Sequence, residues 1–221
     1  MDDPKRVIAD GYDRLAERYV AWAGGSVRDP ARPRYLALLE RELPRGASLL
    51  DLGCATGALV TARLAARFQV TGVDLSPRQI EIARAAIPNA RFIHADMTEV
   101  RFPPASFEAV TAFYALNHLP RRELAPLLTS IAAWLRPSGL FVASLPAGDT
   151  PGEVEPDWLG VPMYFSGYDA ETNTRLIEEA GLRIEQATVE TIEEDGQPVE
   201  FLWVVARKGE DDRPPIALGA M

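Results

Sequence analysis

The chain has few residues of the types that build disulfides and metal sites, and it has no apolar run long enough for a membrane span. Among its 221 residues there is one cysteine, Cys54, and two histidines, His94 and His118. A single cysteine excludes an intrachain disulfide, and no spacing of zinc-site type is present, so we expect no metal and a structural role for Cys54. No stretch approaches the roughly 20 apolar residues of a membrane span, and the first residues are charged rather than apolar. We therefore expect a cytoplasmic protein without a membrane partner.

Basic residues are also scarce relative to acidic ones. The chain has 23 lysines and arginines against 32 aspartates and glutamates, which gives a net charge of −9. A nucleic-acid partner requires a basic face to neutralise phosphates, so we expect none and favour a small molecule. The length and the 47% hydrophobic content fit one globular domain. We expect that domain at residues 1–207, with 208–221 as a flexible tail, in a monomer or homodimer.

Short apolar runs alternate with helical segments through the middle of the chain. The pattern predicts strands at 48–52, 70–73, 91–94, 109–113 and 140–145. Asp169 can cap a helix that ends at Gly181, and two further strands, 182–189 and 199–206, read as a hairpin. The expected fold is α/β: a doubly wound, mostly parallel seven-stranded sheet with an antiparallel C-terminal hairpin, which is a Rossmann-like arrangement.

Two segments flank this pattern and are expected to cover the ligand site. Residues 1–45 predict two helices, which we interpret as an N-terminal helical lid. Residues 146–168 form a long connection with many aromatic residues, and such connections are often functional lids. We interpret this insert as the substrate side; packing over the sheet or a dimer contact are its alternatives. Four acids in the insert could also recognise a basic substrate, although loop acids are commonly only solvated. The expected substrate contacts are Tyr19, Trp158, Tyr164, Phe165 and Tyr168.

The first strand runs into a glycine turn, residues 51–57, and then into a helix expected from about Ala58. A dinucleotide-binding turn would need glycines at 53, 55 and 58, but positions 55 and 58 are alanine. Asp51, at the start of the turn, suits an ammonium group better than a phosphate. The turn therefore favours a ligand without a pyrophosphate.

Carboxylates end the next two predicted strands. Asp74 lies about 20 residues after the turn, where an acidic side chain accepts hydrogen bonds from ribose hydroxyls. Asp96 ends the third strand, where it can accept from an adenine amine while Met97 covers the ring. Together these residues indicate an adenosine that carries a cationic, amino-acid-like tail.

In order, residues 51–57, 73–76, 95–97, 112–119 and 135–140 resemble the successive motifs of class I methyltransferases that use S-adenosylmethionine (SAM). The resemblance spans roughly 8–206 and implies SAM as cofactor. It departs from the common pattern at Ala55, where many relatives have glycine, and at Ser138, where Pro-Gly-Gly is common. By resemblance the cofactor contacts are Gly53 and Gly57 for methionine, Asp74 for ribose, and Asp96 with Met97 for adenine. Further expected cofactor contacts are Tyr12, Asp51, Leu75 and Phe113.

The resemblance implies methyl transfer by in-line displacement. The sulfonium methyl is already electrophilic, so the protein mainly aligns an acceptor and excludes water. His118, after the fourth strand, and Tyr164 are the candidate bases for a hydroxyl or protonated amine. We predict transfer to an O, N or C atom of a small apolar or aromatic metabolite. A SAM-binding protein without methyl transfer, such as a binding module or a rearrangement catalyst, is the alternative, because a fold alone does not separate the two.

Overall fold

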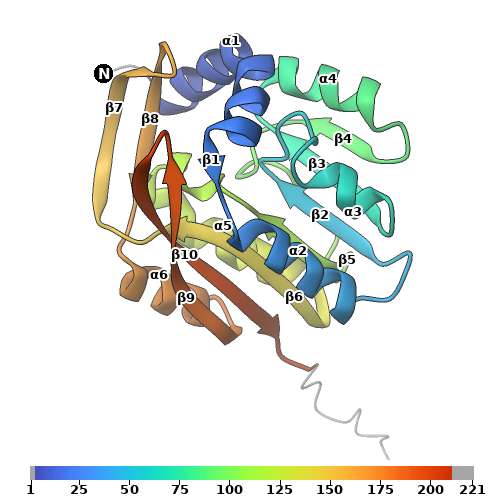
Figure 1. Ribbon diagram of the computed structural model, residues 1–221. Coiled ribbons are helices and arrows are strands. Elements are labelled where there is room, and N and C mark those ends of the chain that lie inside the picture. Colours follow the sequence, from blue (N-terminus) through green and yellow to red (C-terminus); the bar gives the residue numbers. More distant parts are fainter. Residues whose placement is uncertain (1–2, 211–221) are drawn as a thin grey trace, which may run out of the picture.

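A computed structural model describes residues 3–210, so most of the tail predicted at 208–221 lies outside the described residues. Its centre is a sheet of eight strands in the order β1-β9-β10-β6-β5-β2-β3-β4 (Figure 1). Their bounds are β1 (Val27–Arg28), β2 (Ser48–Leu52), β3 (Gln69–Asp74), β4 (Arg91–His94), β5 (Phe107–Ala112), β6 (Leu135–Pro146), β9 (Leu182–Glu194) and β10 (Gln197–Lys208).

The pairing directions confirm the predicted sheet. Strands β4, β3, β2, β5 and β6 pair in parallel, and β10 and β9 continue the sheet in antiparallel pairing. The seven predicted strands are all present. The two-residue β1, which pairs with the end of β9, is an eighth strand that the sequence did not reveal.

Helices cover both faces of the sheet. Residues of α2 (Ala31–Glu42), α3 (Thr61–Ala65) and α4 (Pro77–Ala86) share one buried cluster, and those of α5 (Arg121–Trp134) and α6 (Ala170–Glu179) share the other. Side chains alternate between the two faces of a strand, so Leu49 enters the first cluster and Leu50 the second. A sheet buried on both faces explains why the central strands read as continuous apolar runs.

Of the two N-terminal helices, only α1 (Pro4–Gly25) lies over the carboxyl ends of the strands (Figure 1). Helix α2 instead packs in the core, where Tyr35 stacks on Trp203 at 4.4 Å between ring centroids. The expected lid at 1–45 therefore corresponds in position to α1 alone. None of the helices within residues 3–210 is long and apolar enough to cross a membrane.

Two segments differ locally from expectation. The helix expected from Ala58 begins only at Thr61, because residues 57–60 form a wide turn closed by a hydrogen bond from Ala62 N to Gly57 O of 2.9 Å. The insert is an antiparallel hairpin, β7 (Thr150–Trp158) and β8 (Val161–Gly167), outside the main sheet, and its pairing register shifts at two places. The long connection expected at 146–168 therefore consists largely of two strands. Their prolines are tolerated because a two-stranded ribbon leaves one edge of each strand without backbone partners.

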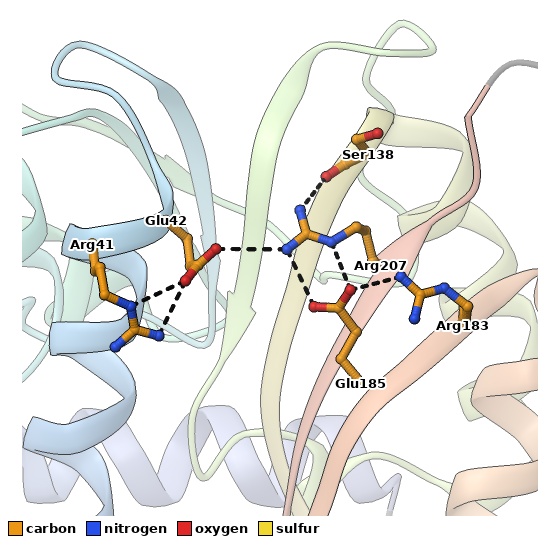
Figure 2. A network of polar contacts seen from close by, with 6 residues as sticks. All are labelled: Arg41, Glu42, Ser138, Arg183, Glu185 and Arg207. Atoms are coloured by element: carbon orange, nitrogen blue, oxygen red, sulfur yellow. Dashed lines mark hydrogen bonds and ion pairs between the residues drawn. The ribbon is translucent and has the colours of Figure 1, made fainter.

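A polar network stabilises the end of the sheet away from α1 (Figure 2). Arg207 on β10 donates to both carboxylate oxygens of Glu185 on β9 and to the carbonyl of Ser138, near the start of β6. It also forms an ion pair with Glu42 at the end of α2, at 3.8 Å. The network connects α2 to the C-terminal strands. It lies at the opposite end of the sheet from the carboxyl ends of the parallel strands, where ligands bind in folds of this kind.

Candidate functional site

The glycine turn lies between β2 and α3. Gly53 has φ +70° and a side chain there would collide with Ala115, while Gly57 has φ +75°. Ala55 also has a positive φ, +49°, and so does Ser138, +61°. These are the two positions where the sequence departs from the methyltransferase pattern, and both adopt the left-handed backbone that glycine accepts most readily.

Asp51, at the end of β2, is buried with 2% of its surface exposed. Its two oxygens accept hydrogen bonds from Thr61 Oγ1 at 2.6 Å and Thr111 Oγ1 at 2.8 Å. Burial raises the pKa of Asp51 to about 6. The hydrogen bonds from the two hydroxyls lower this pKa, and the nearby charge of Asp74 raises it. A cation beside the turn would stabilise the ionised form of this carboxyl.

Asp74, at the end of β3, holds the turn from the neighbouring strand. Its carboxylate accepts from Ala55 N at 2.8 Å and from Ser76 N at 2.9 Å. Burial raises the pKa of Asp74, against the lowering effect of these backbone donors. Each oxygen has further acceptor capacity, so hydroxyl groups of a ligand can still bind there.

Asp96 follows β4 and is engaged by α1. Lys5 Nζ lies 2.5 Å from Asp96 Oδ2 and 2.6 Å from Glu123 Oε2, and it donates to Thr98 Oγ1 at 3.0 Å. Burial favours the neutral carboxyl, but the hydrogen bonds from Lys5 and Thr98 outweigh it and lower the pKa of Asp96. Lys5 therefore attaches the first turn of α1 to the strand end that the sequence assigns to adenine.

His118, in the short 3₁₀ helix η1 (Leu116–His118), is buried with 7% exposed. Its Nδ1 lies 2.8 Å from the Tyr164 carbonyl, which only accepts, so the ring proton is on Nδ1. Nε2 is then the acceptor for the Tyr12 hydroxyl at 2.8 Å. Burial lowers the pKa of His118 to about 4, more than the bond to the Tyr164 carbonyl raises it, so the ring is neutral at neutral pH.

Three cavities lie around these residues. One is lined by the ends of β3 and β4, including Asp74, Leu75, Asp96 and Met97. A second follows the glycine turn and includes Asp51, Gly53 and Gly57. The third and largest, about 640 Å³, lies between α1, the β7–β8 hairpin and the tip of β9–β10. Among residues 3–210, only Tyr19 and Tyr114 line all three cavities. Tyr12 and His118 line the first and third, and Phe113 lines the first and second.

The predicted substrate residues separate into two groups. Tyr19, Trp158 and Phe165 line the large cavity. Tyr164 lines none of the three: its hydroxyl lies against Gly152, and only its carbonyl reaches His118. Tyr168 also lies elsewhere, beneath the Arg121 guanidinium at 4.7 Å from the ring centroid. Side chains alternate between the two faces of a strand, so the neighbours Tyr164 and Phe165 on β8 point to opposite faces, while Tyr168 follows the end of β8.

Sequence reasoning missed two residues of the site. Lys5 gave no signal, since a lysine near a chain start is usually solvated. Tyr114 occupies a left-handed position, φ +55°, and its hydroxyl donates to Asp29 Oδ2 at 2.8 Å, a partner 85 positions away. Its place directly after the fourth strand was the available clue, because ligands bind at the carboxyl ends of parallel strands.

Comparison with known proteins identifies the family. A model described as a methyltransferase domain matches residues 49–139. The chain is 32% identical to dTDP-3-amino-3,6-dideoxy-alpha-D-glucopyranose N,N-dimethyltransferase of Streptomyces fradiae, over 90% of this chain and 73% of the relative. The chain belongs to the class I SAM-dependent methyltransferases.

Other methyltransferases are similar over most of their length. O-methyltransferase cnsE of Penicillium expansum is 28% identical over 82% of this chain and 74% of its own. The structure of 1,6-didemethyltoxoflavin-N1-methyltransferase of Burkholderia thailandensis, with bound 1,6-didemethyltoxoflavin and S-adenosylhomocysteine, has a TM-score of 0.70 at 20% identity and covers 95% of this chain and 92% of that one. The activity of this methyltransferase is therefore SAM-dependent methyl transfer to a small molecule, as the motifs predicted.

The residues of the first two cavities fit SAM chemically. A carboxylate with free lone pairs, Asp74, suits a ribose; the apolar Leu75 and Met97 suit a ring; and the buried Asp51 suits the methionine ammonium. Residues 3–210 contain no group of three histidine, cysteine or acidic side chains arranged to hold a metal ion.

Proposed function

We propose that this methyltransferase binds SAM across the first two cavities and its acceptor in the large cavity, with the reacting atoms beside Tyr19 and Tyr114. The observation that carries this proposal is that, of the residues that the structure describes, these two tyrosines alone line all three cavities. A methyl group that passes between two ligands has to lie where their binding sites meet. The acceptor atom is O, N or C of an apolar or aromatic metabolite, in keeping with the aromatic residues Tyr19, Trp158 and Phe165 around the large cavity.

The proposed cofactor contacts follow the three strand ends. Gly53, Gly57 and Asp51 hold the methionine part, Asp74 with Leu75 the ribose, and Met97 with Asp96 the adenine. Tyr12 borders the cofactor on the side of the large cavity, and Phe113 lies where the two cofactor cavities meet. SAM, when bound, supplies an electrophilic methyl group, so these residues have to hold and orient it rather than activate it.

The Tyr12 and His118 pair is proposed to position the reacting groups. A neutral imidazole with a pKa near 4 is too weak a base to deprotonate an alcohol to a useful extent. Nε2 instead accepts from Tyr12 and fixes the phenol of α1 at the boundary between the cofactor and acceptor cavities. This favours an acceptor whose nucleophilic atom needs no deprotonation, such as a neutral amine, or one that loses its proton to water at the cavity mouth.

The cofactor assignment is tested with Asp74→Ala and the milder Asp74→Asn. We expect SAM affinity to fall about tenfold or more in Asp74→Ala, because hydrogen bonds to a charged acceptor contribute about 1.5–3 kcal/mol. Isothermal calorimetry measures the affinity, and thermal unfolding verifies the fold, since Asp74 also holds Ala55 and Ser76. Glu178→Ala, at an exposed position on α6, is the matched control. A folded Asp74→Ala that binds SAM as tightly as wild type would contradict the assignment.

Transfer itself is tested with methyl-labelled SAM and a metabolite extract. We expect a labelled product together with S-adenosylhomocysteine, and about tenfold less of both with Asp74→Ala when the SAM concentration is below the wild-type Kd. Binding of SAM without any labelled product, across extracts that contain apolar and aromatic metabolites, would favour the binding-only alternative for this chain.

A further inference from the structure

Carboxylates dominate the rim of the large cavity. Among the described residues that line it, six are acidic and one, Arg32, is a permanent cation. The acids come from two separate hairpins, so their gathering at one cavity does not follow from a single charged run. They are Glu153, Glu155 and Asp157 on β7, and Glu194, Asp195 and Glu200 at the tip of β9–β10.

These carboxylates are not neutralised within residues 3–210. None of the six forms an ion pair there, whereas Glu193 and Glu190 on the same β9 strand do. The Arg32 guanidinium is already engaged, with Nε 3.1 Å from Asp29 and its charge 5.0 Å above the Tyr114 ring. The cavity therefore presents a net negative potential to whatever enters it.

The wall beneath this rim is aromatic. Trp158 is at its centre, with ring centroids 5.9 Å from Tyr12, 5.7 Å from Trp22 and 5.6 Å from Phe165. The indole of Trp22 donates to Asp195 at 2.8 Å, so the rim and the aromatic wall are connected. Faces of tryptophan and tyrosine attract cations as well as apolar rings.

Two buried polar atoms on the wall have no partner in the described chain. Ser166, 1% exposed, lines the cavity with its hydroxyl unbonded, and so does Asn117 with its amide oxygen. An unpaired buried polar atom is costly, so a ligand that supplies hydrogen bonds there gains affinity. The amide oxygen can only accept, which calls for an N–H or O–H donor on the ligand.

We propose that the large cavity takes a small cationic amine with an apolar or aromatic body, its ammonium group among the carboxylates and its body against Trp158. The position of the methyl-accepting atom rests on the function proposed above, but the charge preference does not. An acceptor that carries a diphosphate or a carboxylate is disfavoured, because no free cation among the described lining residues would compensate its charge.

The proposal is tested with three probes of one shape: 2-phenylethylamine, phenylacetamide and phenylacetate. Calorimetric titration uses the full-length protein saturated with S-adenosylhomocysteine, so that no transfer occurs. We expect the ammonium probe to bind at least tenfold more tightly than the neutral amide, the carboxylate probe to bind least, and added salt to weaken the ammonium probe alone.

Glu153→Gln/Glu155→Gln should reduce the preference for the ammonium probe about threefold or more and leave the amide unchanged. Glu99→Gln/Glu178→Gln removes the same charge at exposed positions outside the cavity and should change neither. Equal affinity for ammonium and amide in wild type, or tighter binding of the carboxylate, would overturn the proposal. Labelled transfer to a neutral or anionic metabolite would also overturn the amine proposal and leave the methyltransferase function intact. Binding of the amine by a protein that does not bind SAM would support the amine proposal and contradict the proposed function.

Discussion

At the scale of single residues, the two histidines of the chain differ in what they can do. His94 lies at the end of β4 and bonds the Leu75 carbonyl at 3.0 Å, while His118 is buried between Tyr12 and the Tyr164 backbone. A histidine that titrates near neutral pH is a common proton acceptor in enzymes. Burial takes His118 out of that range, so its position in the motif indicated the right place but its chemistry depends on packing that the sequence does not show.

His118→Ala should lower kcat about tenfold while SAM affinity stays within about threefold of wild type, because Tyr12 loses the acceptor that orients it. His118→Gln, whose side-chain oxygen can accept from Tyr12, should recover part of the loss. The rate profile of wild type between pH 6 and 8 should have the same shape as that of both variants, since the pKa of His118 is about 4. A limb near pH 6.5 in wild type that disappears in His118→Ala would show that the histidine is the base and not a positioning residue.

At the scale of elements, residues whose neighbours in space are also neighbours in sequence were predictable. β2 and β4 have the predicted bounds, and the start of α4 is equally local, since Ser76 caps the helix by accepting from Gln79 N. The same distinction applies to the site. Gly53, Asp74 and Asp96 follow from strand ends, whereas Lys5 and Tyr114 depend on long-range contacts, with Asp96 and Asp29.

The contact of α1 with the site depends on Lys5, and Lys5→Met tests it. Partial burial opposes the charge of Lys5, but the hydrogen bonds to Asp96 and Glu123 outweigh it and raise its pKa. Loss of these ion pairs should speed deuterium exchange in the first turns of α1 roughly two- to fivefold, since partly exposed pairs contribute about 0.2–1 kcal/mol. Arg6→Met, an exposed cation on the same turn, should leave exchange unchanged. Equal effects of the two substitutions would mean that helix charge, not the contact with Asp96, holds α1 in place.

At the scale of the whole molecule, acidic groups are concentrated where cationic ligands are proposed to bind. Asp51, Asp74 and Asp96 border the cofactor cavities, and six more carboxylates surround the acceptor cavity, within a chain of net charge −9. A buried carboxylate without a cation lowers the stability of the folded state. The same carboxylates therefore favour cation binding and lower the stability of the ligand-free fold. The pH dependence of unfolding measures this cost at Asp51.

Asp51 has a folded pKa of about 6, above its ordinary value of 3.8. A raised carboxyl pKa means that the folded state binds its proton more tightly, so this contribution to stability is complete below pH 4 and is lost as pH rises through 6. The loss amounts to about 3 kcal/mol at 1.36 kcal/mol per pKa unit, as an order of magnitude.

The substitution Asp51→Asn tests this prediction. It removes the charge, and the new amide can donate to Thr111 Oγ1 while that hydroxyl donates to the Leu50 carbonyl. Without ligand, the variant should match wild type near pH 4 and unfold at a higher temperature at pH 7.5, whereas SAM should stabilise wild type more. An Asp51→Asn protein that is less stable at both pH values would show that the hydrogen bonds from Thr61 and Thr111 stabilise the carboxylate more than its burial costs. The ligand-free fold would then not be destabilised by the charge of Asp51.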